Sequence, residues 1–103
     1  MTTRSAASFR HTCLFALRQP LDEALLSALE AYSLRFRAAF PAIRRYRFDR
    51  NLSRKAGRHL LVLYSEFDDQ DAFRVYVQSA LHDELARFLE PLVEETLIAD
   101  LIC

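Results

Sequence analysis

The most constraining feature of this sequence is the order of its hydrophobic patterns. Four segments are rich in residues that favour strands, and two longer segments repeat apolar residues every three to four positions, which is typical of amphipathic helices. In chain order they predict β-α-β-β-α-β, an α+β ferredoxin-like sandwich with a mostly antiparallel sheet and both helices on one face. The expected strands span about 9–17, 43–52, 58–67 and 96–103, and the expected helices span about 21–39 and the stretch between Asp69 and Pro91.

Local signals mark the ends of both helices. Pro20 stands where the first position of a helix is expected, and the N–H that proline lacks would make no hydrogen bond within the helix there. Pro41 ends the first helix. Asp68 or Asp69 is expected to cap the second helix, because a carboxylate accepts hydrogen bonds from free N–H groups in the first turn. The apolar spacing of the second helix allows a break near Ser79.

The strand segments 58–67 and 96–103 are apolar on both alternating sets of positions, although two helices can cover only one face of a sheet. Leaving the other face in water would forfeit several kcal/mol at roughly 25 cal/mol per Å². We therefore expect a homodimer through the sheet face, in which the sheets of two copies pack face to face. A monomer whose seven-residue polar tail covers the sheet is the alternative, and that tail is too short. The sequence leaves open which set faces the helices: one set is Leu14, Ala16, Leu60, Val62, Tyr64, Leu97, Ala99 and Leu101, and the other is His11, Cys13, Phe15, Leu61, Leu63, Ile98 and Ile102.

Composition narrows the functional class. The chain has 14 basic and 14 acidic residues, so no basic excess indicates nucleic-acid binding. No apolar stretch approaches the ~18 residues of a membrane span, and the first residues lack the apolar run of a signal peptide. Cys13 and Cys103 form no C-x-x-C pair, which favours a reducing, cytoplasmic setting. We expect residues 1–7 to be a disordered tail and residues 8–103 to form a single domain.

No cofactor or metal is expected. The single glycine excludes a glycine-rich phosphate loop, and no H-x-x-x-H or E-x-x-H spacing supports a metal site. Cys13 lies in an apolar strand and is expected to be an inert thiol. Asp100 also lies in an apolar strand, where a carboxylate needs a partner, and we expect an arginine of this chain or from across the subunit boundary to supply it.

Several segments resemble the stress-responsive A/B barrel (Dabb) domain family, and the resemblance runs from about Phe9 to Leu101. Their order and spacing carry it more than any single motif does. It implies a dimeric α+β barrel far more firmly than it implies a reaction. The segments are Arg10-His11, Phe40-Pro41-Ala42-Ile43, Gly57 through Glu66-Phe67-Asp68, Tyr76 with His82, Pro91-Leu92-Val93-Glu94, and Ile98-Ala99-Asp100.

The family often has Tyr-x-x-His-Pro-x-His at the end of its second helix. Here Ser79 and Ala80 replace the first His and the Pro, while Tyr76 and His82 remain. A plant polyketide cyclase of the family uses that Tyr and His in an aldol-type ring closure, so the resemblance implies catalytic roles for Tyr76 and His82. It also matches His11 to the histidine of the family's first strand.

These residues suggest a pocket between the sheet and the helices. A neutral imidazole titrates near pH ~6.5 and can act as a general base, while a tyrosine orients a substrate oxygen. His11 reaches the same pocket if its face of the strand meets the helices. We predict that the pocket is lined by His11, Cys13, Phe15, Tyr76, His82 and Leu85.

Three functions remain open from the sequence. The first is binding of a small apolar or polyketide-like molecule. The second is a cofactor-free cyclase or isomerase with His82 as general base and Tyr76 as its partner, or, as a weaker option, a cofactor-free oxygenase. The third is a structural dimer without ligand, in which these residues and His11 only complete the core. A cavity on the order of 300 Å³ or more favours binding, and a filled core favours the structural dimer.

Overall fold

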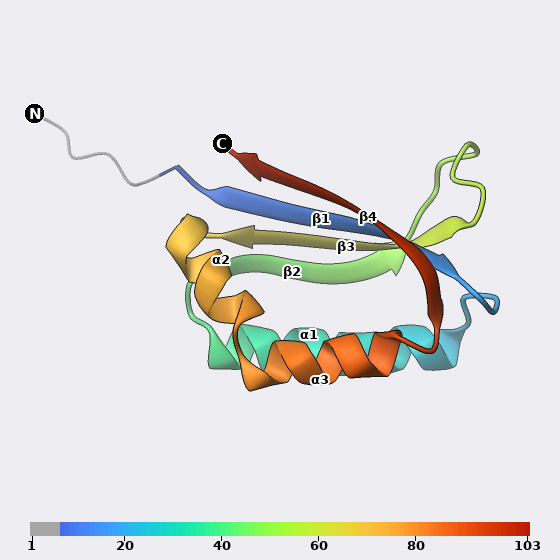
Figure 1. Ribbon diagram of the computed structural model, residues 1–103, viewed down its shortest axis with the longest axis horizontal. Coiled ribbons are helices and arrows are strands. Elements are labelled where there is room, and N and C mark those ends of the chain that lie inside the picture. Colours follow the sequence, from blue (N-terminus) through green and yellow to red (C-terminus); the bar gives the residue numbers. More distant parts are fainter. Residues whose placement is uncertain (1–6) are drawn as a thin grey trace, which may run out of the picture.

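The computed structural model describes residues 7–103 and contains seven elements (Figure 1). Of the expected tail, residues 1–6 lie outside the described part, and Ala7 belongs to no helix or strand. Among the described residues, none of the helices is both long and apolar enough to cross a membrane. The elements are β1 (Phe9–Leu17), α1 (Glu23–Ala39), β2 (Ile43–Arg50), β3 (His59–Phe67), α2 (Gln70–Val77), α3 (Ala80–Leu89) and β4 (Val93–Ile102).

The four strands form one antiparallel sheet in the order β2-β3-β1-β4. Strands β1 and β2 are joined through α1 and have β3 between them, while β3 and β4 are joined through the two shorter helices and have β1 between them. All three helices lie on one side of the sheet (Figure 1). The chain therefore has the predicted α+β, ferredoxin-like arrangement.

Helices α1 and α2 begin at carboxylate caps. Asp22 accepts a hydrogen bond from the Leu25 N–H at 2.9 Å, so α1 starts at Glu23 rather than at residue 21. Asp69, rather than Asp68, caps α2 by accepting from the Ala72 N–H at 2.8 Å. Both caps satisfy N–H groups that have no partner within the helix.

The expected break in the second helix is present, and Ser79 makes it. The Ser79 hydroxyl donates to the Tyr76 carbonyl at 2.7 Å and accepts from the His82 N–H at 3.1 Å. One side chain thus closes α2 and caps α3. The break leaves Tyr76 at the end of one helix and His82 at the start of the next.

The last strand begins earlier than predicted. β4 starts at Val93, which pairs with Leu17, rather than at Thr96. The Arg18 N–H donates to the Leu92 carbonyl at 2.9 Å, so pairing begins immediately after α3. The missed residues include Glu94 and Glu95, whose charges hid the strand because β4 is an edge strand with exposed side chains.

The face of the sheet that meets the helices is now defined. It carries the set that contains His11, Cys13 and Phe15, and these three side chains are buried. On the other face, Leu97 is 47% exposed and Leu101 is 60% exposed. The described chain therefore leaves the second apolar face of its sheet uncovered, as the sequence suggested.

Candidate functional site

A cavity of about 620 Å³ lies between the two shorter helices and strands β1 and β4. Its volume is well above the ~300 Å³ that separates a ligand site from a filled core. All six residues predicted to line a pocket border it. They are His11, Cys13 and Phe15 from β1, Tyr76 from α2, and His82 and Leu85 from α3.

The cavity has further walls that the sequence did not single out. Phe73 and Leu89 add apolar surface from the helices, and Ile98 and Asp100 border the cavity from β4. Ile98 is 61% exposed although it lines the cavity, because β4 is an edge strand without a further strand beside it in the described chain. The helical spacing of Phe73 and Leu89 was visible in the sequence, whereas the contribution of β4 depended on strand register.

One polar part of the cavity wall is a hydrogen-bonded row across β1 and β4. His11 stands directly opposite Asp100 in the strand register, and its Nδ1 lies 2.6 Å from the Asp100 Oδ1. The Cys13 Sγ lies 3.2 Å from the His11 Nε2. Since a carboxylate only accepts, Nδ1 carries the hydrogen, and in the neutral form of the imidazole Nε2 then accepts from the thiol.

The thiol in this row is protonated at neutral pH. Burial first, and the negative charge of Asp100 second, raise the pKa of Cys13 to about 12. A protonated thiol is the donor that the lone pair of His11 Nε2 requires. The two contacts therefore hold the imidazole of His11 in one orientation.

Within the described chain the partner of Asp100 is His11 and not an arginine, and an arginine from across the subunit boundary stays a prediction. The cause is the antiparallel register, which places these two residues opposite each other. Only the pairing of β1 with β4 identifies the histidine.

Tyr76 is buried against a second tyrosine that the sequence analysis missed. Its hydroxyl lies 2.8 Å from the hydroxyl of Tyr46, and each residue is only 1% exposed. Burial raises the pKa of both hydroxyls. Tyr46 lies in the arginine-rich strand β2. It alternates with the apolar Phe48 on one face of that strand, and this alternation was the sequence pattern that could have predicted its burial.

His82 lies half-buried at the cavity wall, with its ring 5.0 Å from the Tyr76 ring in an edge-on arrangement. Partial burial lowers the pKa of His82; the charge of Asp83 opposes this effect and His11 adds to it. Its imidazole is therefore neutral at pH 7. Within residues 7–103 the ring has no side-chain hydrogen-bond partner, so it can accept from or donate to a bound molecule.

These groups make a largely apolar chamber with the imidazoles of His11 and His82 on its walls, and Glu90, Glu94 and Glu95 also border it. The arrangement can enclose an apolar molecule and exchange a proton or hydrogen bond with a carbonyl or hydroxyl group. In the part of the chain that the structure describes, no group of three His, Cys, Asp or Glu side chains is arranged to hold a metal ion.

Comparison with known proteins bears on the fold and the family. The sequence model of the family described as the stress responsive A/B barrel domain matches residues 9–103. No curated protein matches the chain.

Solved structures show the same fold at low sequence identity. A Dabb family protein with a ferredoxin-like fold from Mesorhizobium loti is 23% identical, with a TM-score of 0.76 over 94% of this chain and 97% of that chain. A dimeric ferredoxin-like protein of unknown function from Thermobifida fusca is 19% identical, with a TM-score of 0.78 over 95% of this chain and 92% of that chain. The hydroxynitrile lyase of Passiflora edulis is 16% identical, with a TM-score of 0.79 over 95% of this chain and 94% of that chain.

Proposed function

The chain belongs to the stress-responsive A/B barrel domain family, and from this premise we propose that it is a small homodimeric protein that binds an apolar or polyketide-like molecule. The ligand occupies the cavity between the sheet and helices α2 and α3. We further propose that residues 8–103 act as one domain after a short tail. The protein works in the cytoplasm, in keeping with the free thiols of Cys13 and Cys103.

The observation that carries this proposal is the cavity itself. Its volume of about 620 Å³ falls within the ~300–1,000 Å³ range of small-molecule sites. Its walls combine aromatic and aliphatic side chains with His11, His82 and several carboxylates, which suits an apolar skeleton that carries carbonyl or hydroxyl groups. A filled core was the expectation for a structural dimer without ligand, so the cavity argues against that alternative.

The binding test compares two exposed alanines that differ only in where they point. Ala86 on α3 lines the cavity, whereas Ala31 is an exposed residue of α1 that does not line it. Ala86→Phe fills the chamber, and Ala31→Phe is the matched control. In a thermal-shift screen of β-polyketones and aromatic ketones, a compound that raises Tm of the wild type and of Ala31→Phe should lose its effect on Ala86→Phe. Equal effects on all three proteins would place binding elsewhere.

Homodimerisation through the open face of the sheet is supported by exposed apolar side chains and by the dimeric relatives. Leu97→Glu places a charge on that face, whereas Leu34→Glu changes a leucine that is 56% exposed on α1 and serves as the control. Light scattering should give twice the protomer mass for the wild type and for Leu34→Glu. It should give a smaller average mass for Leu97→Glu. A wild-type protein at single protomer mass would contradict the dimer.

Catalysis by His82 is the second candidate, favoured by its neutral imidazole and free ring nitrogens. Tyr76 lies beside it, but its hydroxyl is engaged with Tyr46, so a substrate oxygen must share that hydrogen bond. In a cyclase or isomerase assay with a linear β-polyketone, His82→Ala should abolish turnover while leaving the far-ultraviolet circular dichroism unchanged. Unchanged turnover would remove His82 from the mechanism.

A further inference from the structure

Cys13 occupies a position that simple core packing does not explain. Its sulfur borders the cavity and lies at one end of the row that continues through His11 to Asp100. The order is a thiol, an imidazole and a carboxylate, with 3.2 Å from Sγ to Nε2 and 2.6 Å from Nδ1 to Oδ1. A nucleophile, a base and a group that orients the base stand in this relation in enzymes that activate a hydroxyl or thiol.

Each member of the row has a defined task. Because the thiol is protonated at rest, the sulfur becomes nucleophilic only as a base removes its proton, and His11 Nε2 is placed to do so. The Asp100 carboxylate then faces the imidazolium that forms and stabilises it. The sequence-based expectation of an inert thiol rested on the apolar strand alone and took no account of the imidazole beside the sulfur.

The surrounding backbone selects the type of electrophile. Cys13 lies on the central strand β1 and pairs with Leu63 on one side and Ile98 on the other, so its own N–H is committed to the sheet. An acyl substrate needs a donor beside the sulfur for its oxyanion. In conjugate addition the negative charge develops on an oxygen several bonds away from the sulfur. The ring of His82, which has no side-chain hydrogen-bond partner among the described residues, lies on another wall of the same cavity and can donate to it.

We propose that Cys13 is a covalent attachment site for α,β-unsaturated carbonyl compounds that enter the cavity, with His11 as the base and Asp100 as the residue that positions it. The inference rests on the proposed function, because the electrophile must first occupy the cavity. The Cys13 sulfur attacks the β-carbon, and the carbon–carbon π pair moves into an enolate. The thiol proton passes to His11 Nε2 and then to the α-carbon. The net result is addition of S–H across the double bond, which needs no oxidant or reductant.

The experiment uses the wild-type chain, which carries its own control in the exposed Cys103. The protein is incubated with 2-cyclohexenone at pH 7, and peptide mass spectrometry follows the adduct on each cysteine. Cys13 should be labelled faster than Cys103 in spite of its burial. If the exposed thiol reacts first, the proposal is overturned without recourse to any variant.

Variants in a Cys103→Ser background then test the row. His11→Ala should slow labelling of Cys13 by at least about 100-fold, and added imidazole should restore part of the rate. Asp100→Asn should slow labelling less, and Asp100→Glu should recover much of the rate that Asp100→Asn loses. Restoration by imidazole and by glutamate separates proton transfer and positioning from a structural defect. A His11→Ala protein that reacts as fast as its parent overturns the proposal.

The saturated analogue cyclohexanone separates this inference from the proposed function. Cyclohexanone cannot form the adduct, so a Tm shift that Ala86→Phe removes reports occupancy of the cavity alone. Occupancy by cyclohexanone without Cys13 labelling by cyclohexenone overturns the covalent site and leaves ligand binding intact. Failure of both compounds to raise Tm or to label Cys13 counts against both proposals.

Discussion

The two halves of the space between the sheet and the helices differ sharply, although they belong to one sheet and one helical layer. Next to β2 and β3, the rings of Phe36, Tyr46, Phe67 and Tyr76 pack with centroid separations of 4.9–5.7 Å. Next to β1 and β4, the space is a cavity. We call these the packed half and the hollow half.

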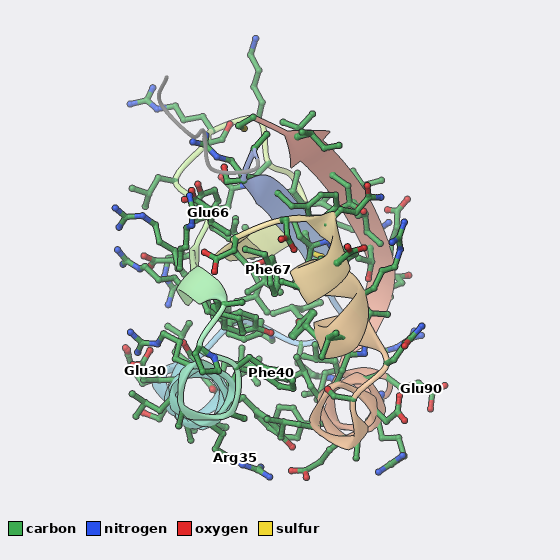
Figure 2. All side chains as sticks on the ribbon, turned by 90° about the vertical axis from the view of Figure 1, so that its left-hand side faces the viewer. Glu30, Arg35, Phe40, Glu66, Phe67 and Glu90 are labelled. Atoms are coloured by element: carbon green, nitrogen blue, oxygen red, sulfur yellow. The ribbon has the colours of Figure 1, made fainter. Side chains whose placement is uncertain are left out.

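The difference follows from what each helix carries. In Figure 2, α1 and α3 lie side by side below the sheet, with α2 nearer to the sheet. Phe36 of α1 and Tyr76 of α2 are large enough to span the gap to the sheet in the packed half. In the hollow half α3 presents Leu85 and Leu89, whose shorter side chains leave the gap partly empty. Side-chain length, rather than hydrophobicity, decides where the cavity forms.

The largest expected effects come from deleting one leucine in each half. Leu29 is fully buried in α1, whereas Leu85 borders the cavity. We expect Leu29→Ala to lower the free energy of unfolding by about 4 kcal/mol and Leu85→Ala by about 2 kcal/mol, because a side chain that already borders empty space loses fewer contacts. Urea denaturation at equal protein concentration measures both, and Leu34→Ala is the exposed control. Equal losses of unfolding free energy for the two variants would contradict the difference in packing between the packed half and the hollow half.

The hydroxyl pair in the packed half gives the next effect. Tyr46→Phe leaves the buried Tyr76 hydroxyl without its partner, so we expect a loss of about 1–3 kcal/mol. The double variant Tyr46→Phe/Tyr76→Phe should cost less than the sum of the single variants, because it removes both polar groups. Strict additivity in a double-mutant cycle by urea denaturation would show that the two hydroxyls do not interact.

His82 reports on the hollow half through pH. Because partial burial lowers the pKa of His82 in the folded chain, the unfolded chain binds its proton first as the pH falls. Stability from this group is therefore full above about pH 6.5 and is lost as the pH falls from there toward the folded-state pKa. The urea midpoint of the wild type should drop more between pH 7.5 and pH 5.5 than that of His82→Gln. Identical pH profiles would mean that water surrounds this histidine fully.

The smallest effect on stability is expected at the exposed contact between α1 and α3. Glu84 accepts from Arg35 at 2.6 Å and from the Tyr32 hydroxyl at 3.0 Å, and these hydrogen bonds hold the pKa of the Glu84 carboxyl below its usual range. The pair is exposed, so Glu84→Gln should shift the urea midpoint only slightly, and less at high salt. A shift of the urea midpoint as large as that of Tyr46→Phe would show that the hydrogen bonds of Glu84, rather than the packed half, hold α3 in place.

Much of the architecture could be predicted from the sequence because it depends on residues that are close together in the chain. The alternation of strands, the carboxylate caps and the break at Ser79 are local properties, and the family resemblance placed Tyr76 and His82. The predicted start of β4 was wrong because the charged residues Glu94 and Glu95 are typical of a loop. An edge strand can carry such exposed charges, but the sequence does not show that β4 is an edge strand. The six pocket residues were found since strand parity and helix spacing already group them.

What the sequence determined by itself was the order of elements and the existence of two apolar sheet faces, because both follow from the period of its side chains. Only the tertiary structure decided which face meets the helices, that Tyr46 pairs with Tyr76, and that His11 stands between Cys13 and Asp100. These relations depend on strand register and on how far the helices lie from the sheet. Both are set by packing between segments that are remote in the chain, so no local pattern encodes them.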